Sequence, residues 1–250
     1  MKLIITGCEH VGKTTLAAAV SRWLADLTGY SRSFHDHFTL PSPEVAGDDR
    51  ELFMRMSPAF KERFQRYQMA YHAGGSFLSG DDHLLVGYHI EEAVFPPLYY
   101  GYGGRGEYAD RSVYARRIEH GIMKDAPDTI LVLLTARPEV IRERMRRDPM
   151  PRDQKGRRPG VLREKDVEHV LQRFREEFAA SLIRRKFVLD NSDLSPEETL
   201  SEFTWKAQKY LSHEDRTRIA ARQVLVERGD SREGVVEGDK TLPPEERISI

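Results

Sequence analysis

The chain has 250 residues and carries 39 lysines and arginines against 40 aspartates and glutamates, a formal net charge of -1. This length suits one sizeable domain with an appendage. The balance of charge excludes the overall basic field of general nucleic-acid binders, although a local basic patch stays open. No apolar run approaches the roughly 20 residues that span a bilayer. With one cysteine, Cys8, and no signal-peptide pattern, we expect a cytoplasmic protein that binds no membrane.

The first expected strand and helix enclose a glycine-rich loop. Lys2 to Thr6 is a short β-rich run typical of a buried parallel strand, and residues 13–27 place apolar side chains on one helical face. Between them stands the pattern G-x-x-x-x-G-K-[ST], whose backbone amides and helix N-terminus bind phosphate. We therefore expect a binding site for ATP formed by Gly7, His10, Val11, Gly12, Lys13, Thr14 and Thr15.

Two side chains of this loop have predicted chemical roles. Lys13 is expected to reach the β- and γ-phosphates, and the Thr14 hydroxyl is expected to ligate Mg²⁺. The pattern identifies the nucleotide site, but it does not distinguish a kinase from a switch or a motor. The rest of the chain must make that choice.

A second strand is expected at residues 30–34, and it runs into His35, Asp36 and His37. Ligands of open parallel sheets bind beyond the carboxyl ends of the strands. Asp36 is thus a candidate base for an acceptor hydroxyl, or a group that holds the metal through water. A turn or helix-cap carboxylate is the alternative for Asp36. The two histidines are interpreted as ordinary turn residues rather than metal ligands.

The next predicted helix spans residues 58–72 and is ended by Gly74 and Gly75. Gln65 and Gln68 lie off its main stripe, where an amide can pair with a nucleobase edge, so both are candidate substrate residues. The main stripe is aromatic and is interpreted as part of the core. It contains Phe60, Phe64, Tyr67 and Tyr71.

A paired carboxylate follows the third expected strand, at residues 84–86. Glu91 and Glu92 would stand near the triphosphate, where a carboxylate can hold a metal-bound water or orient a sugar hydroxyl. The alternative is that both are solvated residues of a first helical turn, favoured there by the helix dipole. We favour a functional role for one of the two.

Basic residues crowd the chain after the fourth expected strand, at residues 129–134, where Pro138 introduces a new helix. Such a run is usually a solvated face. Beside a triphosphate site, however, a Pro- and Gly-interrupted stretch over about residues 142–163 predicts a helical lid whose arginines cover the transferring phosphoryl group. Its basic residues are Arg142, Arg144, Arg146, Arg147, Arg152, Lys155, Arg157 and Arg158.

The remaining elements complete the expected domain. Helices are predicted at residues 109–124 and 164–183, a fifth strand at 186–189, and a last core helix with Ser195 as its cap and Glu198 completing a capping box. Strands that alternate with helices predict a doubly wound α/β fold with a five-stranded parallel sheet. The kinase-like core is expected at 1–212. Residues 213–250 are expected to be a charged tail, with one marginal helix near 216–227 and disorder beyond it.

This combination resembles the thymidylate kinase and deoxyribonucleoside kinase group of P-loop proteins over roughly residues 1–210. The resemblance rests on the phosphate loop, the acidic group after strand two, the arginine-rich lid and the segment Leu189 to Ser192. Residues 88–101 are similar to a segment of phage-type thymidylate kinase relatives, in which an Asp-Arg pair precedes an aromatic residue, a His and a Ser-Glu. His89 and Glu92 match that segment, which implies that His89 lies at the substrate.

The chain departs from those relatives at the Asp-Arg pair, where it has Gly87 and Tyr88. Arg111, in an Asp-Arg-Ser stretch similar to a deoxyribonucleoside kinase motif, is the candidate replacement from a later helix. Without such a replacement, neutral hydroxyl acceptors are favoured over monophosphates.

The resemblance implies an Mg²⁺-dependent kinase that transfers the γ-phosphoryl group of ATP to a thymidine-like deoxynucleoside or a dTMP-like monophosphate. The candidate catalytic residues are then Lys13, Asp36, Glu92 and Arg111. Two alternatives stay open: a kinase that acts on a modified base or strand end of DNA, and a P-loop ATPase switch whose tail docks a partner. The sequence also leaves a homodimer open.

Overall fold

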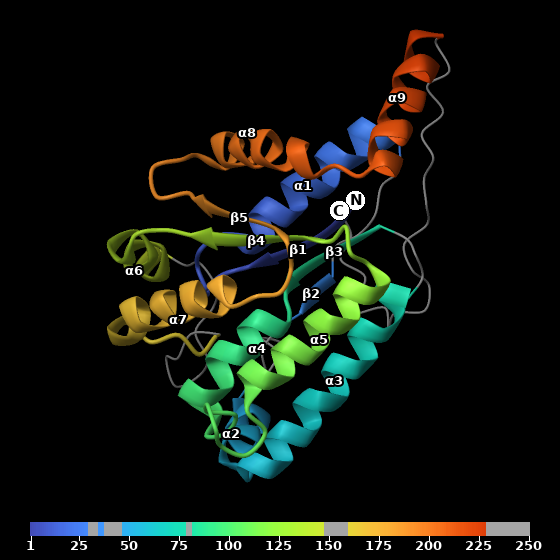
Figure 1. The fold of residues 1–250 in the computed structure, drawn as a ribbon. Coiled ribbons are helices and arrows are strands. Elements are labelled where there is room, and N and C mark those ends of the chain that lie inside the picture. The colour runs from blue at the N-terminus through green and yellow to red at the C-terminus, as the bar shows by residue number, and fades with distance from the viewer. Residues whose placement is uncertain (30–34, 38–46, 79–81, 148–159, 229–250) are drawn as a thin grey trace.

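The computed structural model describes residues 1–29, 35–37, 47–78, 82–147 and 160–228. A parallel β-sheet lies at its centre (Figure 1), with the strand order β2-β3-β1-β4-β5. Residues 3–5 of the central strand pair with β3 on one side and with β4 on the other. The strands are β1 (Lys2–Thr6), β2 (His35–His37), β3 (His83–Gly87), β4 (Ile130–Thr135) and β5 (Arg185–Asp190).

Helices cover both faces of this sheet (Figure 1). One layer contains α1 (Lys13–Thr28), α8 (Pro196–Ala207) and α9 (His213–Glu227). The other contains α4 (His89–Phe95), α5 (Arg111–Asp125) and α7 (Val167–Ala179), with α6 (Pro138–Arg147) packed on α7. Because both faces are covered, β3 and β4 are buried along their whole length. The predicted doubly wound parallel α/β fold is confirmed.

The sheet order determines where a ligand would bind. Strands β2 and β3 lie on one side of β1, and β4 and β5 lie on the other, so the direction of the crossovers changes beside β1. In open α/β sheets, the crevice at such a switch point, beyond the carboxyl ends of the strands, is the usual binding site. The glycine-rich loop leaves β1 at this end.

Several elements differ from those expected. Helix α3 (Pro58–Leu78) continues through Gly74 and Gly75, which were predicted to end it. Two helices had not been predicted: α2 (Gly47–Arg55) and α4, the latter continued by a π-helical turn at Pro96–Tyr100. The second strand lies at His35–His37, whereas residues 30–34, where it was expected, lie outside the described part of the chain.

The interpretation of the α3 aromatic stripe as core was wrong. Phe60, Phe64 and Tyr67 are 52%, 43% and 72% exposed, and the face of α3 turned inward carries Lys61, Glu62 and Gln65. Lys61 and Glu62 have partners inside the protein: Lys61 donates to the Met54 carbonyl oxygen, and Glu62 pairs with Arg111. The side chain of Tyr71 lies outside the described residues.

The last two described helices begin at capping boxes. The predicted box of Ser195 and Glu198 is present at α8. Helix α9 begins with a second box, formed by Ser212 and Asp215, three residues earlier than expected. Arg218 of α9 donates to Asp82, which lies just before β3, at 2.7 Å, and this contact attaches the helix to the core. The division at residue 212 stays a prediction, and residues 229–250 lie outside the description.

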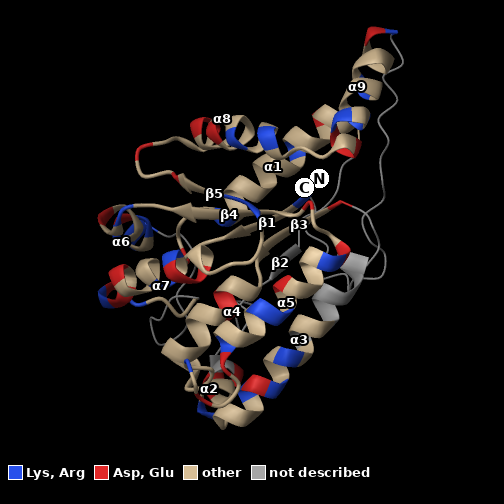
Figure 2. Ribbon diagram, in the orientation of Figure 1, with Lys and Arg blue, Asp and Glu red and all other residues tan. Residues whose placement is uncertain are grey.

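Charged residues of both signs are interspersed over the helices (Figure 2). Among the described residues, no helix has both the length and the apolar character that a membrane span requires.

Candidate active site

The loop between β1 and α1 has the backbone that its pattern predicts. Gly12 has φ +96°, and a Cβ at Gly7 would stand 2.3 Å from the Leu134 carbonyl oxygen, so neither position tolerates a side chain. His10 also adopts a left-handed conformation, with φ 63°. No side chain caps the start of α1 at Gly12. The positive end of the helix dipole is therefore left facing the position where a phosphate would bind.

Lys13 folds back across this loop. Its Nζ donates to the carbonyl oxygens of Gly7 at 2.9 Å and Cys8 at 3.0 Å, and it lies 3.0 Å from Glu91 Oε1. The side chains of Lys13 and Glu91 are 12% and 6% exposed. The lysine that is predicted to bind phosphate therefore contacts Glu91, one of the two acidic residues that the sequence singled out, although the two are far apart in the chain.

Tyr88, whose backbone is strained, sets the direction of helix α4, which carries Glu91 and Glu92. Tyr88 is buried, with φ 74° and ψ -145°, a conformation that bulky residues rarely adopt. This turn starts α4 directly after β3. As a result, Glu91 reaches the phosphate loop. Glu92 lies instead near Tyr102 and Tyr114, where its charge adds to the effect of burial in raising the pKa of both phenols. Both glutamates lie in the first turn of α4, as the alternative interpretation expected, but they are buried, so that alternative is wrong in describing them as solvated.

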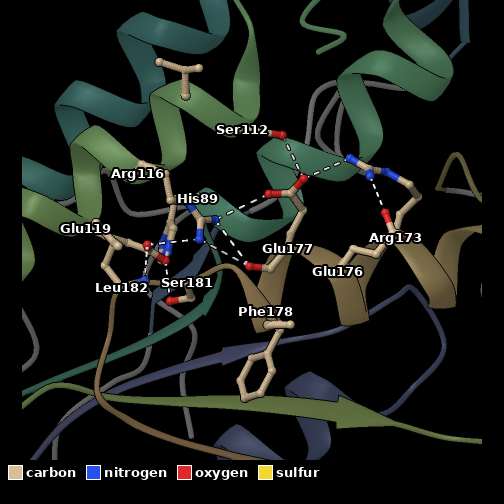
Figure 3. A network of polar contacts seen from close by, with 12 residues as sticks. His89, Ser112, Arg116, Glu119, Arg173, Glu176, Glu177, Phe178, Ser181 and Leu182 are labelled. Carbon is tan, nitrogen blue, oxygen red and sulfur yellow. Dashed lines mark hydrogen bonds and ion pairs between the residues drawn. The ribbon is translucent and has the colours of Figure 1, made fainter.

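His89 points away from solvent. Its ring is fully buried, and Nε2 lies 2.9 Å from Glu119 Oε1 on α5 (Figure 3). Glu119 also accepts hydrogen bonds from the Ser181 hydroxyl at 2.6 Å and the Leu182 amide at 2.8 Å. This burial speaks against the substrate contact predicted for His89. The geometry gives the residue a structural role, joining α4 to α5 and to the turn before β5.

A second buried carboxylate extends this network (Figure 3). Glu177 of α7 accepts from the Ser112 hydroxyl at 2.7 Å and from Arg173 at 2.9 Å, and it lies 3.4 Å from Arg116 Nη2. Arg116 Nη1 lies 3.2 Å from Glu119 Oε2. The network therefore connects α4, α5 and α7. Its partners are up to 65 residues apart, and no local pattern in the sequence indicated it.

Arg111 is fully buried and lies among aromatic rings. Its guanidinium carbon is 5.1 Å from the ring centroid of Tyr102 and 4.9 Å from that of Tyr114, and Nη2 is 3.6 Å from Glu62 Oε1. We refer to Glu62, Glu92, Tyr102, Arg111 and Tyr114 as the Arg111 cluster. The sequence identified Arg111 and Glu92 in this cluster, but it gave no signal for Glu62 or for the two tyrosines.

Gln65 is the described member of the predicted amide pair. It is 1% exposed, and its Nε2 has no hydrogen-bond partner among the described residues. A buried donor of this kind is costly unless a ligand or water satisfies it. Gln65 lies on the same inward face of α3 as Glu62. The side chain of Gln68 lies outside the description.

The arginines of α6 are held by protein groups. Arg144 donates to the Val11 carbonyl at 3.0 Å and to the side chain and main chain of Asn191, each at 3.1 Å. Asn191 Nδ2 donates to the same Val11 carbonyl at 2.9 Å. Arg144 and Asn191, neither of which the sequence identified as a site residue, thus brace the phosphate loop. Each of the other α6 arginines is paired with a glutamate, namely Arg142 with Glu168, Arg146 with Glu164 and Arg147 with Glu143.

Most of the predicted lid lies outside the described residues, as do the side chains of Arg152, Lys155, Arg157 and Arg158. The chain resumes at Gly160, beside the phosphate loop. There the Glu9 carboxylate accepts from the amides of Val161 at 3.0 Å and Leu162 at 2.9 Å. The Glu9 side chain therefore fixes the point at which the arginine-rich segment returns to the core.

The predicted metal ligands fit a nucleotide-bound ion better than a protein cage. Thr14 is exposed in the first turn of α1, whereas the side chain of Asp36 lies outside the description. The backbone of Asp36 in β2 pairs in register with Val86 in β3, one residue before the carboxyl end of each strand. Among the described residues, no group of three or more acidic, histidine or cysteine side chains could hold a metal. Mg²⁺ commonly binds through one or two protein oxygens together with substrate phosphates, which agrees with this donor set.

No protein-family model matches the sequence, and no curated protein matches it. Among solved structures, the chain is similar to the deoxyadenosine kinase from M. mycoides with bound dATP, with 16% identity, a TM-score of 0.53, and coverage of 82% of this chain and 98% of that chain. It is also similar to the YorR protein from Bacillus subtilis in complex with phosphorylated GDP, with 17% identity, a TM-score of 0.50, and coverage of 85% and 100%. Together with the phosphate loop, this likeness shows that the chain has the fold of the P-loop nucleoside and nucleotide kinase group.

Proposed function

We propose that the protein is an Mg²⁺-dependent kinase that transfers the γ-phosphoryl group of ATP to a deoxynucleoside or a deoxynucleoside monophosphate. The observation that carries this proposal is the 3.0 Å contact between Lys13 Nζ and Glu91 Oε1. The contact brings the phosphate-binding lysine and an acidic helix together at the switch point of the sheet, where a donor and an acceptor can meet. The fold shared with deoxyadenosine kinase supports this proposal.

The loop supplies the groups that a nucleoside triphosphate needs. The uncapped start of α1 faces the phosphates, and Lys13 exchanges its loop carbonyls for phosphate oxygens. Bound Mg²⁺ would neutralise charge on the β- and γ-phosphates, with the Thr14 hydroxyl as its protein ligand and Asp36 as a second group acting through water. Arg144 and Asn191 both donate to the Val11 carbonyl oxygen and so hold the loop backbone in place.

Glu91 and Glu92 have different proposed roles. Glu91 contacts Lys13, so we assign Glu91 to the acceptor hydroxyl, which it orients and whose proton it accepts. Glu92, the candidate that the sequence favoured, instead faces the phenols of the Arg111 cluster. The proposed role of Glu92 is to keep in place the side of the acceptor site that the Arg111 cluster forms. Gln65 Nε2, a buried donor without a hydrogen-bond partner among the described residues, is assigned to a nucleobase edge.

The charges of the Arg111 cluster favour a neutral acceptor. Arg111 Nη2 lies 3.6 Å from Glu62 Oε1. Arg66 Nη2 also donates to both carboxylate oxygens of Glu62, at 2.8 Å to Oε1 and 2.7 Å to Oε2. Arg111 and Arg66 are therefore both engaged by Glu62, and a monophosphate acceptor would have to displace Glu62 from them. A deoxynucleoside hydroxyl requires no such exchange. We accordingly favour a deoxynucleoside over its monophosphate.

The test is ATP consumption by the purified protein with Mg²⁺ and a panel of acceptors, namely each deoxynucleoside, each monophosphate, and DNA with and without modified pyrimidines. Stimulation by one deoxynucleoside is the expected result. Stimulation by a monophosphate alone would overturn the choice of acceptor class but not the kinase. Stimulation by DNA alone, or slow turnover indifferent to every acceptor, would contradict the proposal in favour of a polymer kinase or a switch. The Lys13→Ala variant excludes a contaminating ATPase.

A further inference from the structure

Glu62 of α3 lies between two arginines. Its side chain is 2% exposed and accepts hydrogen bonds from Arg66, one turn further along the same helix, while Arg111 Nη2 approaches it from α5. Arg111 Nη2 also donates to the main-chain carbonyl of Glu62, at 3.4 Å. Helices α3 and α5 lie side by side (Figure 1). Two guanidinium groups from neighbouring helices thus converge on one buried carboxylate.

A pair of guanidinium groups is a common means of binding a phosphate. Each group presents its donors in a planar fork that fits a carboxylate or a phosphate. Arg66 uses this fork here, because its Nε donates to Glu62 Oε1 at 3.0 Å and its Nη2 donates to both carboxylate oxygens. Arg111 has a further donor available, since its buried Nε has no hydrogen-bond partner among the described residues. The carboxylate of Glu62 therefore occupies an anion-binding position.

This position lies among the residues assigned to the acceptor. Gln65, which is assigned to a nucleobase edge, follows Glu62 by three residues, so the two lie on the same inward face of α3. From α4, Glu92 follows the residue assigned to the acceptor hydroxyl, and burial together with the charge of Glu92 raises the pKa of Tyr102. The ring of Tyr102 in turn contacts Arg111. The anion-binding position is thus connected to the proposed reaction site on both sides.

The charges of this region leave no excess for a phosphate. Arg66 and Arg111 are balanced by Glu62 and Glu92. A monophosphate would bring its negative charge into a neutral and partly buried environment, where an uncompensated charge is costly. Removing the charge of Glu62 would leave the two arginines in excess.

We propose that Glu62 determines the class of acceptor: its carboxylate occupies the position of an acceptor phosphate and so excludes deoxynucleoside monophosphates in favour of deoxynucleosides. This inference rests on the proposed function. An anion built into the protein repels the wrong substrate and leaves the neutral one unaffected, which is an effective way to discriminate between them. The alternative is a purely structural counter-ion for Arg111. The loss of its charge would then change stability but not the choice of acceptor.

The test compares kcat/KM for each deoxynucleoside monophosphate with kcat/KM for the corresponding deoxynucleoside, in the presence of ATP and Mg²⁺. In Glu62→Gln, which keeps the shape of the side chain and removes its charge, the ratio for the preferred base should rise about tenfold or more, because two guanidinium groups become available to the phosphate. Glu177→Gln is the matched control and should leave the ratio unchanged. Glu177 is 1% exposed and is also paired with arginines, but it belongs to the network of Figure 3.

Two double variants connect the gain to the arginines. Adding Arg111→Met to Glu62→Gln should abolish the gain, because the phosphate then loses its buried partner. Should Glu62→Gln alone fail to fold by circular dichroism, the charge-balanced pair of Glu62→Gln with Arg66→Gln still frees Arg111. The ratio should rise in that pair as well, to a lesser degree.

Calorimetric titration without ATP adds a readout that needs no turnover. The affinity of Glu62→Gln for the monophosphate should be about tenfold or more above that of the wild type. A folded variant with the ratio and affinity of the wild type, a gain that survives Arg111→Met, or a wild type that already prefers monophosphates would each overturn the inference and leave the kinase intact. A wild type that neither binds nor uses either class of acceptor would overturn the proposed function, and this inference with it.

Discussion

Lys13 of the phosphate loop and Glu91 of α4 form an ion pair at 3.0 Å, although 78 residues separate them in the chain. The pair explains how two charged side chains can be buried at the carboxyl end of a sheet, because each neutralises the other. In the proposed mechanism, a bound triphosphate would attract Lys13 away from Glu91 and leave the carboxylate available for an acceptor hydroxyl.

The first prediction concerns Lys13. Lys13→Ala should lower the rate of phosphoryl transfer by at least a hundredfold to a thousandfold, the usual effect of losing one preorganised donor to a charged transition state. Circular dichroism should show that the sheet and helices still form, although the loop loses the hydrogen bonds from Lys13 to the Gly7 and Cys8 carbonyl oxygens and Glu91 loses this ion pair. Lys209→Ala, at an exposed lysine of the turn after α8, is the control. Turnover in Lys13→Ala equal to that of the wild type would contradict the mechanism.

The second prediction concerns Arg111. Arg111→Ala should destabilise the protein by about 3 kcal/mol or more in urea unfolding, because Glu62 loses a buried partner. Arg111→Lys keeps the charge but loses the planar contact with the two tyrosine rings. This milder variant should raise KM for the acceptor and leave KM for ATP unchanged. Arg117→Ala, an exposed arginine of the same helix, serves as the control. Equal changes in both KM values would refute an acceptor-side role.

The third prediction concerns the brace on the phosphate loop. Arg144→Ala removes the hydrogen bonds that Arg144 donates to the Val11 carbonyl oxygen and to Asn191. The backbone amides of the phosphate loop should then be held less firmly. Because each lost hydrogen bond involves a charged donor, we expect about a tenfold weaker affinity for ATP, measured by calorimetry. Arg147→Ala is the matched control, since Arg147 is 79% exposed and its ion pair among the described residues is with Glu143. Unchanged ATP affinity in Arg144→Ala would show that the loop holds its shape without this arginine.

The fourth prediction is a pH dependence of stability. Burial opposes the charge on Glu119, but hydrogen bonds from His89, Ser181 and the Leu182 amide outweigh burial and hold its pKa below the ordinary value. The folded-state pKa is therefore depressed relative to the unfolded chain. This contribution is fully present above about pH 4.3, the unfolded value, and is lost as the pH falls through the lower folded value.

Glu119→Gln should consequently cost about 1 to 3 kcal/mol near neutral pH, and the difference from the wild type should shrink as the solution is acidified. Chemical unfolding at several pH values measures both effects. A difference that stays constant down to strongly acidic pH would mean that the Glu119 charge does not contribute to stability. Glu214→Gln, at an exposed position of α9, is the control.

The fifth prediction concerns Cys8. Burial raises the pKa of this loop thiol to about 12, and Lys13 offsets the rise only in part. Since the thiolate is the reactive form and Cys8 is 1% exposed, alkylation by iodoacetamide should be slow in the native protein even at mildly alkaline pH. The reaction should become rapid in denaturant. Fast labelling of the native protein, followed by mass spectrometry, would contradict the burial of the loop.

The sequence by itself determined the local features of this protein. The bounds of β1 and the start of α1 were predicted correctly, because a buried parallel strand and a phosphate loop impose their own residue pattern over a dozen positions. The capping box at Ser195 was predicted for the same reason, since both of its hydrogen bonds lie within four residues. The parallel fold followed from the alternation of such elements.

Only the tertiary structure decided which polar residues are buried. Helix α4 was missed because His89, Glu91 and Glu92 are typical of a solvated segment, and they are buried here because Glu119, Lys13 and the Arg111 cluster lie against them. The stripe on α3 was assigned to the core because aromatic side chains usually bury their area, yet the inner face of that helix is occupied by Glu62 and Gln65. Burial of a charge depends on a partner that comes from a distant part of the chain, and no local periodicity contains that information.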